Sequence, residues 1–303
     1  MAKLVGICLE RLNPFRLNLK KKTSNQSHLL SQKELRMTNV ADVCRYLESF
    51  APTALAEDWD NVGLLMGDRQ TSVSKVMTCL TVTSAVAEEA IAQNVNMVVT
   101  HHPIPFKGVK RISTDSPTGS LLWKLASNGI AIYSPHTAFD SARSGINQQL
   151  ADGLGLSEVK PLRPFELDDG ASLGGLGKGR RGDCPPVQLG ALASTVAGFL
   201  QIAGLHIVGD PEMQVSRVGI GCGSAGEFIH SASRAGCQVL LTGEARFHTC
   251  LEAEAIGMAM ILPGHYASER FALETLATQL TSEFPDVSVW ASRQESDPLT
   301  WME

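Results

Sequence analysis

The segment VNMVVTHHPIPFKGVKRI, residues 95–112, carries the pattern on which the fold prediction rests. An apolar run over residues 95–100 ends in the adjacent pair His101 and His102, and a proline follows at once. Apolar runs of about four to eight residues between turn signals are typical of strands buried on both faces of a sheet. The segment therefore predicts a buried strand whose carboxyl end carries two histidines.

Similar short runs alternate with helical patterns along the rest of the chain. This alternation favours β-α units and a mainly parallel sheet. The expected strands are 76–82, 95–100, 130–134, 205–209, 217–222, 238–242, 258–262 and 287–291. The expected helices are 84–93, 119–128, 145–153, 188–202, 225–235, 248–256 and 266–281. Between these two series lies LRPFELDDGASLGGLGKGRRGDCPP, residues 162–186, which is expected to be rich in loops.

The predicted fold class is α/β, with two similar β-α lobes whose sheets are mainly parallel. The expected lobes are residues 37–155 and 215–303, and residues 156–214 form the joint between them. Residues 1–36 contain three consecutive lysines and a polar tract without periodicity. We expect them to be an N-terminal extension outside the folded α/β domain, 37–303.

Composition limits the class of protein. The chain has 303 residues, 44% of them hydrophobic, and a net charge of -5, which argues against a general nucleic-acid binder. No apolar run approaches the roughly 20 residues that span a bilayer, so no membrane association is expected. Seven cysteines are scattered without a CxxC pair and predict reduced thiols, mostly small buried apolar residues, in a cytoplasmic protein.

Candidate ligands follow four of the predicted strands. In open parallel sheets, binding sites lie beyond the carboxyl ends of the strands. Five of the eight histidines fall at such ends. The residues are His101 and His102, then His136 and Asp140, then Glu244 and His248, and finally His265 and Glu269.

Imidazoles and carboxylates together suit Zn, Fe, Mn or Ni. Adjacent histidines on an extended backbone point to opposite sides, so each would serve a different ion. A carboxylate such as Glu269 can bridge two divalent cations about 3.5–4 Å apart. The alternative for any one of these histidines is a turn residue or a hydrogen-bonded cap.

Several further residues have two interpretations. His136 and His248 suit proton transfer, or each only orients a ligand. Glu244 either holds a substrate group or caps a helix. The WDN sequence at residues 59–61 either forms a turn with a packed indole or lines the cleft. Lys107, Lys110 and Arg111 either meet an anionic substrate or lie on a solvated surface.

The order of several motifs resembles the NIF-three-like family, whose members are often described as GTP cyclohydrolase one type two homologs or dinuclear metal centre proteins. The motifs are AEDWDNVGLLMGD (56–68), VVTHHPIPFKGVKRI, IYSPHTAFDSARSGINQQLA, VGIGCGSAGEFI, LLTGEARFH and PGHYASERFALE. The resemblance covers about residues 38 to 303. Many members have LDVT where this chain has LTVT, so Thr81 stands at a position often held by aspartate.

The resemblance implies a metal site made by five residues: His101, His102, Asp140, His265 and Glu269. On the family pattern, His102 and Asp140 hold one ion, His101 and His265 hold the other, and Glu269 bridges both. It also implies a three-layer α/β fold whose sheets pack around a metal cleft, and a homo-oligomer, either a trimer or a hexamer of stacked trimers.

These features lead to two functional hypotheses. The first is a dinuclear metal-dependent hydrolase, cyclohydrolase-like, that acts on a small nucleotide-like substrate, with Glu269 and His248 as catalytic residues. The second is a metal-binding regulatory or assembly protein without catalytic turnover.

Overall fold

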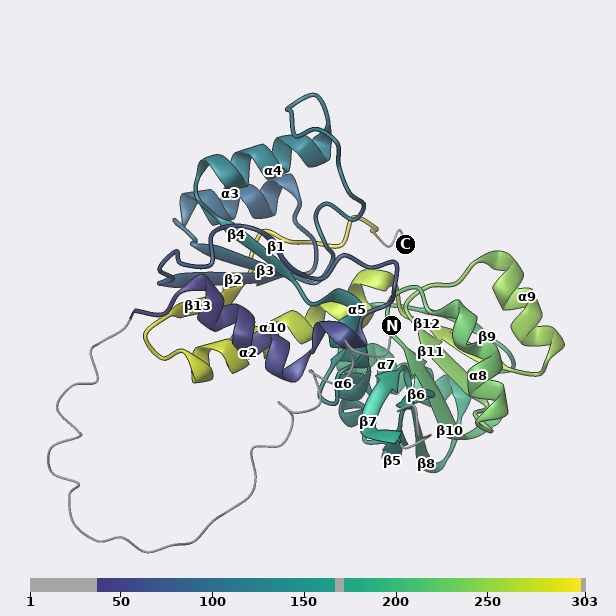
Figure 1. Ribbon diagram of the computed structural model, residues 1–303. Helices are drawn as coiled ribbons and strands as arrows, with labels where there is room; N and C mark the ends of the chain where they lie inside the picture. Colours follow the sequence, from purple (N-terminus) through teal and green to yellow (C-terminus); the bar gives the residue numbers. More distant parts are fainter. Residues whose placement is uncertain (1–36, 167–171, 301–303) are drawn as a thin grey trace, which may run out of the picture. The chain divides into compact units, whose positions relative to one another are not determined.

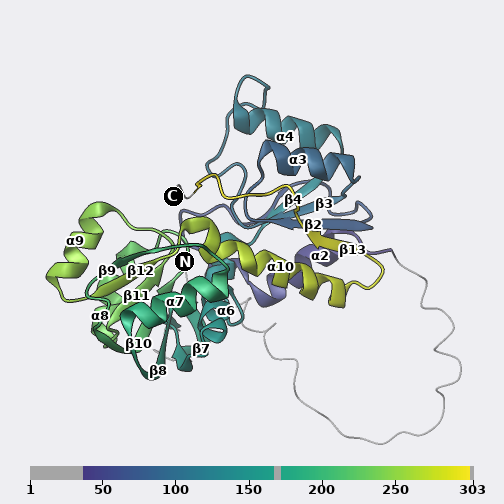
Figure 2. The same cartoon turned by 180° about the vertical axis from the view of Figure 1, so that it is seen from behind.

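Two β-sheets, each covered by helices on both faces, make up most of the described chain (Figures 1 and 2). The computed structural model describes residues 37–166 and 172–300, so the prediction for residues 1–36 lies outside the described residues. Helices cover a parallel strand on both faces when the chain follows β-α units, and this explains the unbroken apolar runs in the sequence. The predicted α/β class with mainly parallel sheets is confirmed.

The first sheet contains five strands. In spatial order they are β1 (Gly63–Met66), β4 (Ala131–Ser134), β3 (Met97–Thr100), β2 (Lys75–Cys79) and β13 (Ser288–Ala291). All pairs are parallel except β1 with β4. The strand predicted from the HisHis segment is β3, and it lies in the middle of this sheet with all four residues buried.

The second sheet contains six strands. In spatial order they are β5 (Ser157–Lys160), β8 (Arg180–Gln188), β10 (Gln214–Gly221), β11 (Val239–Thr242), β12 (Ala259–Leu262) and β9 (His206–Val208). The β10, β11 and β12 strands are parallel, and a separate antiparallel pair joins β6 (Arg163–Glu166) to β7 (Ser172–Lys178).

The helices form three groups around these sheets. One outer group, α3 (Ser84–Ala92) and α4 (Pro117–Ser127), packs on the first sheet, and another, α8 (Ile229–Arg234) and α9 (Phe247–Ala255), packs on the second. The third group contributes to the core that both sheets share. It contains α2 (Val40–Phe50), α5 (His136–Ser141), α6 (Ile146–Gly153), α7 (Leu189–Leu200) and α10 (His265–Glu283).

Helix α10 connects the two sheets and leads directly to the metal-ligand candidates. Its buried residues recur at helical spacing from Ser268 and Glu269 to Leu280, and the helix contacts β2 and β13. An apolar stripe at this spacing holds a helix against the core. The helix therefore fixes the position of its first turn, where His265 and Glu269 lie.

Two predictions about the middle and the end of the chain are wrong. Residues 162–186 are not mainly loops, because β6, β7 and most of β8 lie there, and β8 pairs with β10 inside the second sheet. The β13 strand joins the first sheet rather than a lobe of residues 215–303. Sheet membership therefore does not follow the predicted lobe boundaries.

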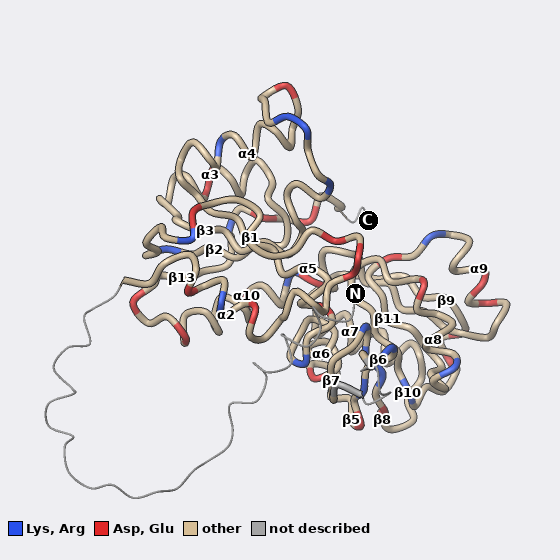
Figure 3. The backbone as a smooth tube through the Cα atoms, viewed as in Figure 1, with Lys and Arg blue, Asp and Glu red and all other residues tan. Residues whose placement is uncertain are grey.

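Two short 3-10 helices lie at Thr53–Leu55 and Gly226–Phe228. Within residues 37–166 and 172–300, none of the helices combines the length and the apolar character needed to cross a bilayer. Lys and Arg are interspersed with Asp and Glu along the backbone (Figure 3).

Candidate metal centre

The paired histidines follow β3 and remain attached to the edge of the neighbouring strand. The backbone N–H of His101 donates to the Cys79 carbonyl at 2.9 Å, and that of His102 donates to the Leu80 carbonyl at 2.8 Å. These bonds continue the extended backbone past the end of the strand. His101 is fully buried, whereas the His102 side chain keeps 26% of its surface exposed.

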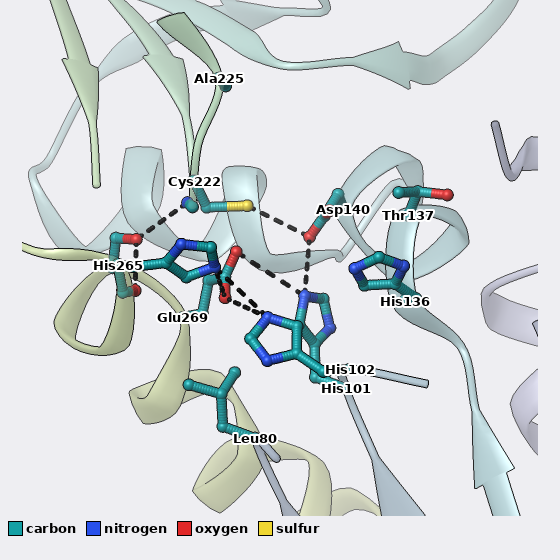
Figure 4. Close-up of polar contacts among 12 residues, drawn as sticks. Leu80, His101, His102, His136, Thr137, Asp140, Cys222, Ala225, His265 and Glu269 are labelled. Carbon is teal, nitrogen blue, oxygen red and sulfur yellow. Dashed lines mark hydrogen bonds and ion pairs between the residues drawn. The ribbon is translucent and has the colours of Figure 1, made fainter. Parts of the chain in front are cut away.

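The Glu269 carboxylate faces both imidazoles (Figure 4). His102 Nε2 is 3.1 Å from Glu269 Oε2, and His101 Nε2 is 3.8 Å from Glu269 Oε1. The two histidines therefore face different oxygens of the same carboxylate. Each ring therefore has its own carboxylate oxygen as a neighbour.

His265 and Glu269 are one helical turn apart at the start of α10. His265 Nε2 lies 3.1 Å from Glu269 Oε2 and 3.3 Å from His102 Nε2. Ligand atoms about 2.1 Å from a tetrahedral ion are about 3.4 Å from one another. One oxygen and two nitrogens are thus spaced as ligands of one cation, and these three side chains form a candidate metal-binding group.

Asp140 approaches from α5 on the other side. Its Oδ1 is 3.7 Å from His101 Nε2 and accepts a hydrogen bond from the Cys222 thiol at 3.1 Å. Asn147 donates to the Asp140 carbonyl at 3.1 Å and accepts from the Cys222 backbone N–H at 2.8 Å. Cys222 and Asn147 were not predicted as site residues, since an apolar strand end and a helix residue carry no ligand signal.

The five expected ligands converge, but their pairing differs from the family pattern described above. The distances place His101 with Asp140 and with Glu269 Oε1. They place His102 with His265 and with Glu269 Oε2. The expected pairs, His102 with Asp140 and His101 with His265, are exchanged because α5 approaches the buried ring and α10 approaches the exposed one.

Burial and charge shift the pKa values of these groups. Burial raises the pKa of the Asp140 carboxyl. Burial would also raise the pKa of Glu269, but the imidazoles, above all His101, hold it well below its usual range. The hydrogen bond to Glu269 raises the pKa of His265 to about 9, whereas burial lowers the pKa of His102.

The donor set fits divalent cations. Both ring nitrogens of His101 are buried without a hydrogen-bond partner, although burial of an unsatisfied polar atom is costly. Burial opposes a charge on His101, yet Asp140 and Glu269 outweigh it and raise its pKa. A cation between these groups would satisfy Nε2 of His101 and the carboxylates of Asp140 and Glu269.

Outer partners hold the two exposed imidazoles in place. Thr81 Oγ1 lies 2.7 Å from His102 Nδ1, and Glu244 Oε1 lies 3.0 Å from His265 Nδ1. Such partners orient metal-ligating histidines and set their tautomer. Thr81 and Glu244 therefore each hold a candidate ligand, and the Glu244 side chain does not cap a helix.

Gly223 allows the second sheet to approach the site closely. It adopts φ +61°, and a Cβ built on it would lie 2.2 Å from Glu269 Oε1. Its backbone N–H donates to Ser268 Oγ at 2.9 Å. The glycine-rich turn after β10 thus packs against the Glu269 carboxylate.

A cavity of about 350 Å³ opens onto these ligands. Trp59 and Phe106, with ring centroids 5.8 Å apart, form an aromatic wall, and Lys178 pairs with Glu57 at 2.6 Å on the lining. The WDN segment therefore contributes to the cleft. The candidate ligands, the aromatic wall and the ion pair therefore line the same cavity.

Other predicted residues lie outside the cavity. His248 is exposed on α9 and is not among the lining residues, and the same holds for Lys107, Lys110 and Arg111 in the loop after β3. By contrast, His136 lines the cavity. Of the two histidines expected to transfer protons, only His136 is near the ligands.

Fold and site together define an α/β protein with a candidate metal centre of histidines and carboxylates at the ends of its strands. The profile of the Duf34/NIF3 (NGG1p interacting factor 3) family matches residues 38–298, and the chain belongs to that family. The earlier resemblance is thereby confirmed.

Relatives and solved structures agree with this assignment. A protein of Clostridium acetobutylicum named GTP cyclohydrolase 1 type 2 homolog is 35% identical over 76% of this chain and 85% of its own length. Protein NIF3 homolog of Schizosaccharomyces pombe is 33% identical over 85% of this chain and 96% of its length. The structure of Staphylococcus aureus hypothetical protein SA1388 is similar, with a TM-score of 0.80, 26% identity and coverage of 88% and 100%.

Proposed function

We propose that the protein is a dinuclear metal-dependent hydrolase that acts on a small anionic or nucleotide-like substrate. The observation that carries this proposal is the placement of His101 and His102 at the two oxygens of Glu269. One carboxylate shared by two separate sets of nitrogen ligands suits a pair of cations. The names of the relatives, GTP cyclohydrolase 1 type 2 homolog, support the same reaction class.

A pair of divalent cations held there would lower the pKa of a bound water toward neutrality and polarise the bond to be cleaved. Asp140 and Glu269 neutralise only part of the charge of two such cations, so the cavity would attract an anion. Four of the five candidate ligands line the cavity, namely His102, Asp140, His265 and Glu269, and Glu269 contacts both histidines.

The cavity wall supports a substrate with a planar part. Trp59 is 60% exposed and Phe106 is 49% exposed, and both line the cavity. Exposed aromatic faces stack on planar groups at a low cost in side-chain entropy. Lys178 can leave Glu57 to meet an anionic substituent, since both side chains remain more than a quarter exposed.

A screen for turnover tests the proposal. Elemental analysis of the purified protein first establishes its metals, and the loaded protein is then incubated with nucleotides and related metabolites. Glu269→Gln should abolish turnover, and Glu252→Gln, an exposed acid on α9 paired with His230, should not. If the loaded protein turns over none of the screened compounds faster than Glu269→Gln, the hydrolase proposal fails.

The second candidate is a metal-binding regulatory or assembly protein. It is favoured by α9, which exposes Phe247 (71%) and Leu251 (46%) one helical turn apart. Apolar side chains in such a row are typical of contact surfaces between proteins. We propose self-association into a trimer or hexamer through such surfaces. In this case Glu269→Gln would change metal content and assembly, and no reaction would be affected.

The cysteines bear on where the protein acts. In the described residues, Cys44, Cys79, Cys184, Cys222, Cys237 and Cys250 are free thiols. Free thiols persist in a reducing compartment. We accordingly propose that the protein acts in the cytoplasm.

A further inference from the structure

His136 occupies a strained position at the first turn of α5. Its φ is +26°, a region that side chains other than glycine rarely adopt. Such strain persists when the surrounding structure holds the residue, and it is concentrated at functional sites. The packing of Trp59 and Phe106, each with its ring centroid 6.1 Å from that of His136, contributes to holding the ring.

Asp60 holds one nitrogen of this ring. Its side chain is fully buried, and Oδ1 lies 2.7 Å from His136 Nδ1. The carboxylate accepts from the backbone N–H of Asn61 at 2.7 Å and from that of Thr137 at 3.2 Å. Since an ionised carboxylate only accepts, His136 Nδ1 donates to it. This leaves Nε2 as the ring nitrogen that is available to bind a metal ion.

The His136 ring faces the metal-ligand candidates (Figure 4). A ring nitrogen of His136 lies within 4.8 Å of nitrogens of both His101 and His102, and these three form a second candidate metal-binding group. The ring centroid is nearer to His101, at 5.1 Å, than to His102, at 5.6 Å. Ligand nitrogens about 2.1 Å from a tetrahedral ion lie about 3.4 Å apart, so a movement of at most about 1.4 Å brings the His136 nitrogen into range.

The two helices that supply the carboxylates share a pattern. His136 precedes Asp140 by four residues on α5, as His265 precedes Glu269 on α10, and each helix follows a strand and a proline. On α10, His265 and Glu269 both belong to the candidate metal-binding group that includes His102. The outer carboxylate Asp60 corresponds in role to Glu244 on His265. A histidine held at Nδ1 by a carboxylate is the usual arrangement of a metal ligand.

We propose that His136 is a further metal ligand, which joins the ion held by His101, Asp140 and Glu269. The proposal rests on the proposed function only in that ions bind at this site. The ion beside His101 then has two imidazoles and two carboxylates, and the ion beside His102 has fewer protein ligands and stays open to the cavity. Closed coordination retains a metal, and an open position admits water and substrate.

The test uses His136→Asn. Asparagine tolerates positive φ and places its amide nitrogen where Nδ1 was, so the hydrogen bond to Asp60 survives while Nε2 is lost. Metal-free protein is titrated with Co²⁺, and each ion is followed by visible absorption and by competition with a chelator. We expect the affinity for one ion to fall by more than about 100-fold, since changes in outer partners alone cost about 10–100-fold. The absorption of that ion should change as well.

His230→Asn is the matched control, because His230 is a half-exposed histidine held by a carboxylate, Glu252, on the outer face of the second sheet. This variant should bind both ions with the affinity and the absorption of the wild-type protein. Wild-type protein that binds two ions, with His136→Asn identical to it, overturns this proposal alone and leaves His136 a proton-transfer group. Wild-type protein that binds no ion overturns the proposed function together with it.

A measurement on the wild-type protein decides the matter if the variant does not fold. Protein labelled with ¹⁵N and loaded with ¹¹³Cd shows coupling between the cadmium and each ligating nitrogen. Coupling to His136 Nε2, in addition to His101, His102 and His265, supports the proposal. Coupling to those three histidines without His136 refutes it.

Discussion

Substitution of Gly223 by alanine should disable the metal centre and spare the fold. At φ +61°, alanine costs about 1–2 kcal/mol, which a domain of ordinary stability survives. The added Cβ would lie 2.2 Å from Glu269 Oε1, where ordinary contact begins at 3.4 Å. The carboxylate must therefore move by about 1.2 Å, which is several times the tolerance of about 0.2 Å in metal–ligand distances.

Gly257→Ala separates the two effects. Gly257 has φ +69°, nearly that of Gly223, and a Cβ there meets no atom within 4 Å. Both metal-free variants should unfold at similar temperatures, since they carry the same backbone strain. Only Gly223→Ala should lose metal affinity, by about 100-fold, because a displacement of about 1 Å at a site has costs of this order.

The assay is a chelator competition with Zn²⁺, with thermal unfolding of the metal-free proteins beside it. Equal metal affinity of Gly223→Ala and Gly257→Ala would show that Glu269 is not held where the structure has it. A large loss of stability in Gly223→Ala alone would instead assign the glycine to the fold. Either result contradicts the reasoning.

Three further outcomes are expected. Thr81→Val should lower the affinity for one ion by about 10–100-fold in the same chelator competition. Thr81→Ser should not, because it retains the hydroxyl that meets His102 Nδ1. His248→Ala should change neither metal content nor turnover, measured by elemental analysis and in the metabolite screen, because His248 does not line the cavity. Glu89 accepts hydrogen bonds from the Ser292 hydroxyl and the Arg293 backbone, and although burial opposes it, these bonds lower its pKa. Its contribution to stability is present above the usual carboxyl pKa and is lost as the pH falls below about 4.5, so denaturant unfolding of Glu89→Gln should depend less on pH in that range.

Strand-end positions were the part of the site that could be predicted from the sequence. Periodicity placed β3, β4, β11 and β12 within a few residues, and ligands gather beyond the carboxyl ends of parallel strands. That rule gave eight candidates, and the family resemblance selected His101, His102, Asp140, His265 and Glu269 from among them. The structure brings these five together through α5 and α10.

The strands between residues 156 and 188 could not be recognised in the same way. β8 reads RRGDCPPVQ, which combines charges, a glycine and two prolines, and its burial follows no clean alternation. Two features compensate for this composition. Arg180 is buried and donates to the carbonyls of Ala142, Gly175, Gly177 and Gly179, and Arg217 on β10 pairs with Asp183. Side-chain bonds from distant segments hold such a strand, and no local pattern encodes them.

The partners of each histidine depend on how the two sheets face each other. Sequence order brings His136 and Asp140 onto one helix and His265 and Glu269 onto another, but it does not determine which helix meets the buried ring of His101. That choice follows from the shared core, where α10 packs beneath β2 and positions His265 beside the more exposed His102. His248 shows that a histidine placed after a strand does not always join the site. It follows β11 as closely as the ligands follow their strands, yet α9 turns outward with Phe247 exposed, so a strand end is a necessary condition for joining this site and not a sufficient one.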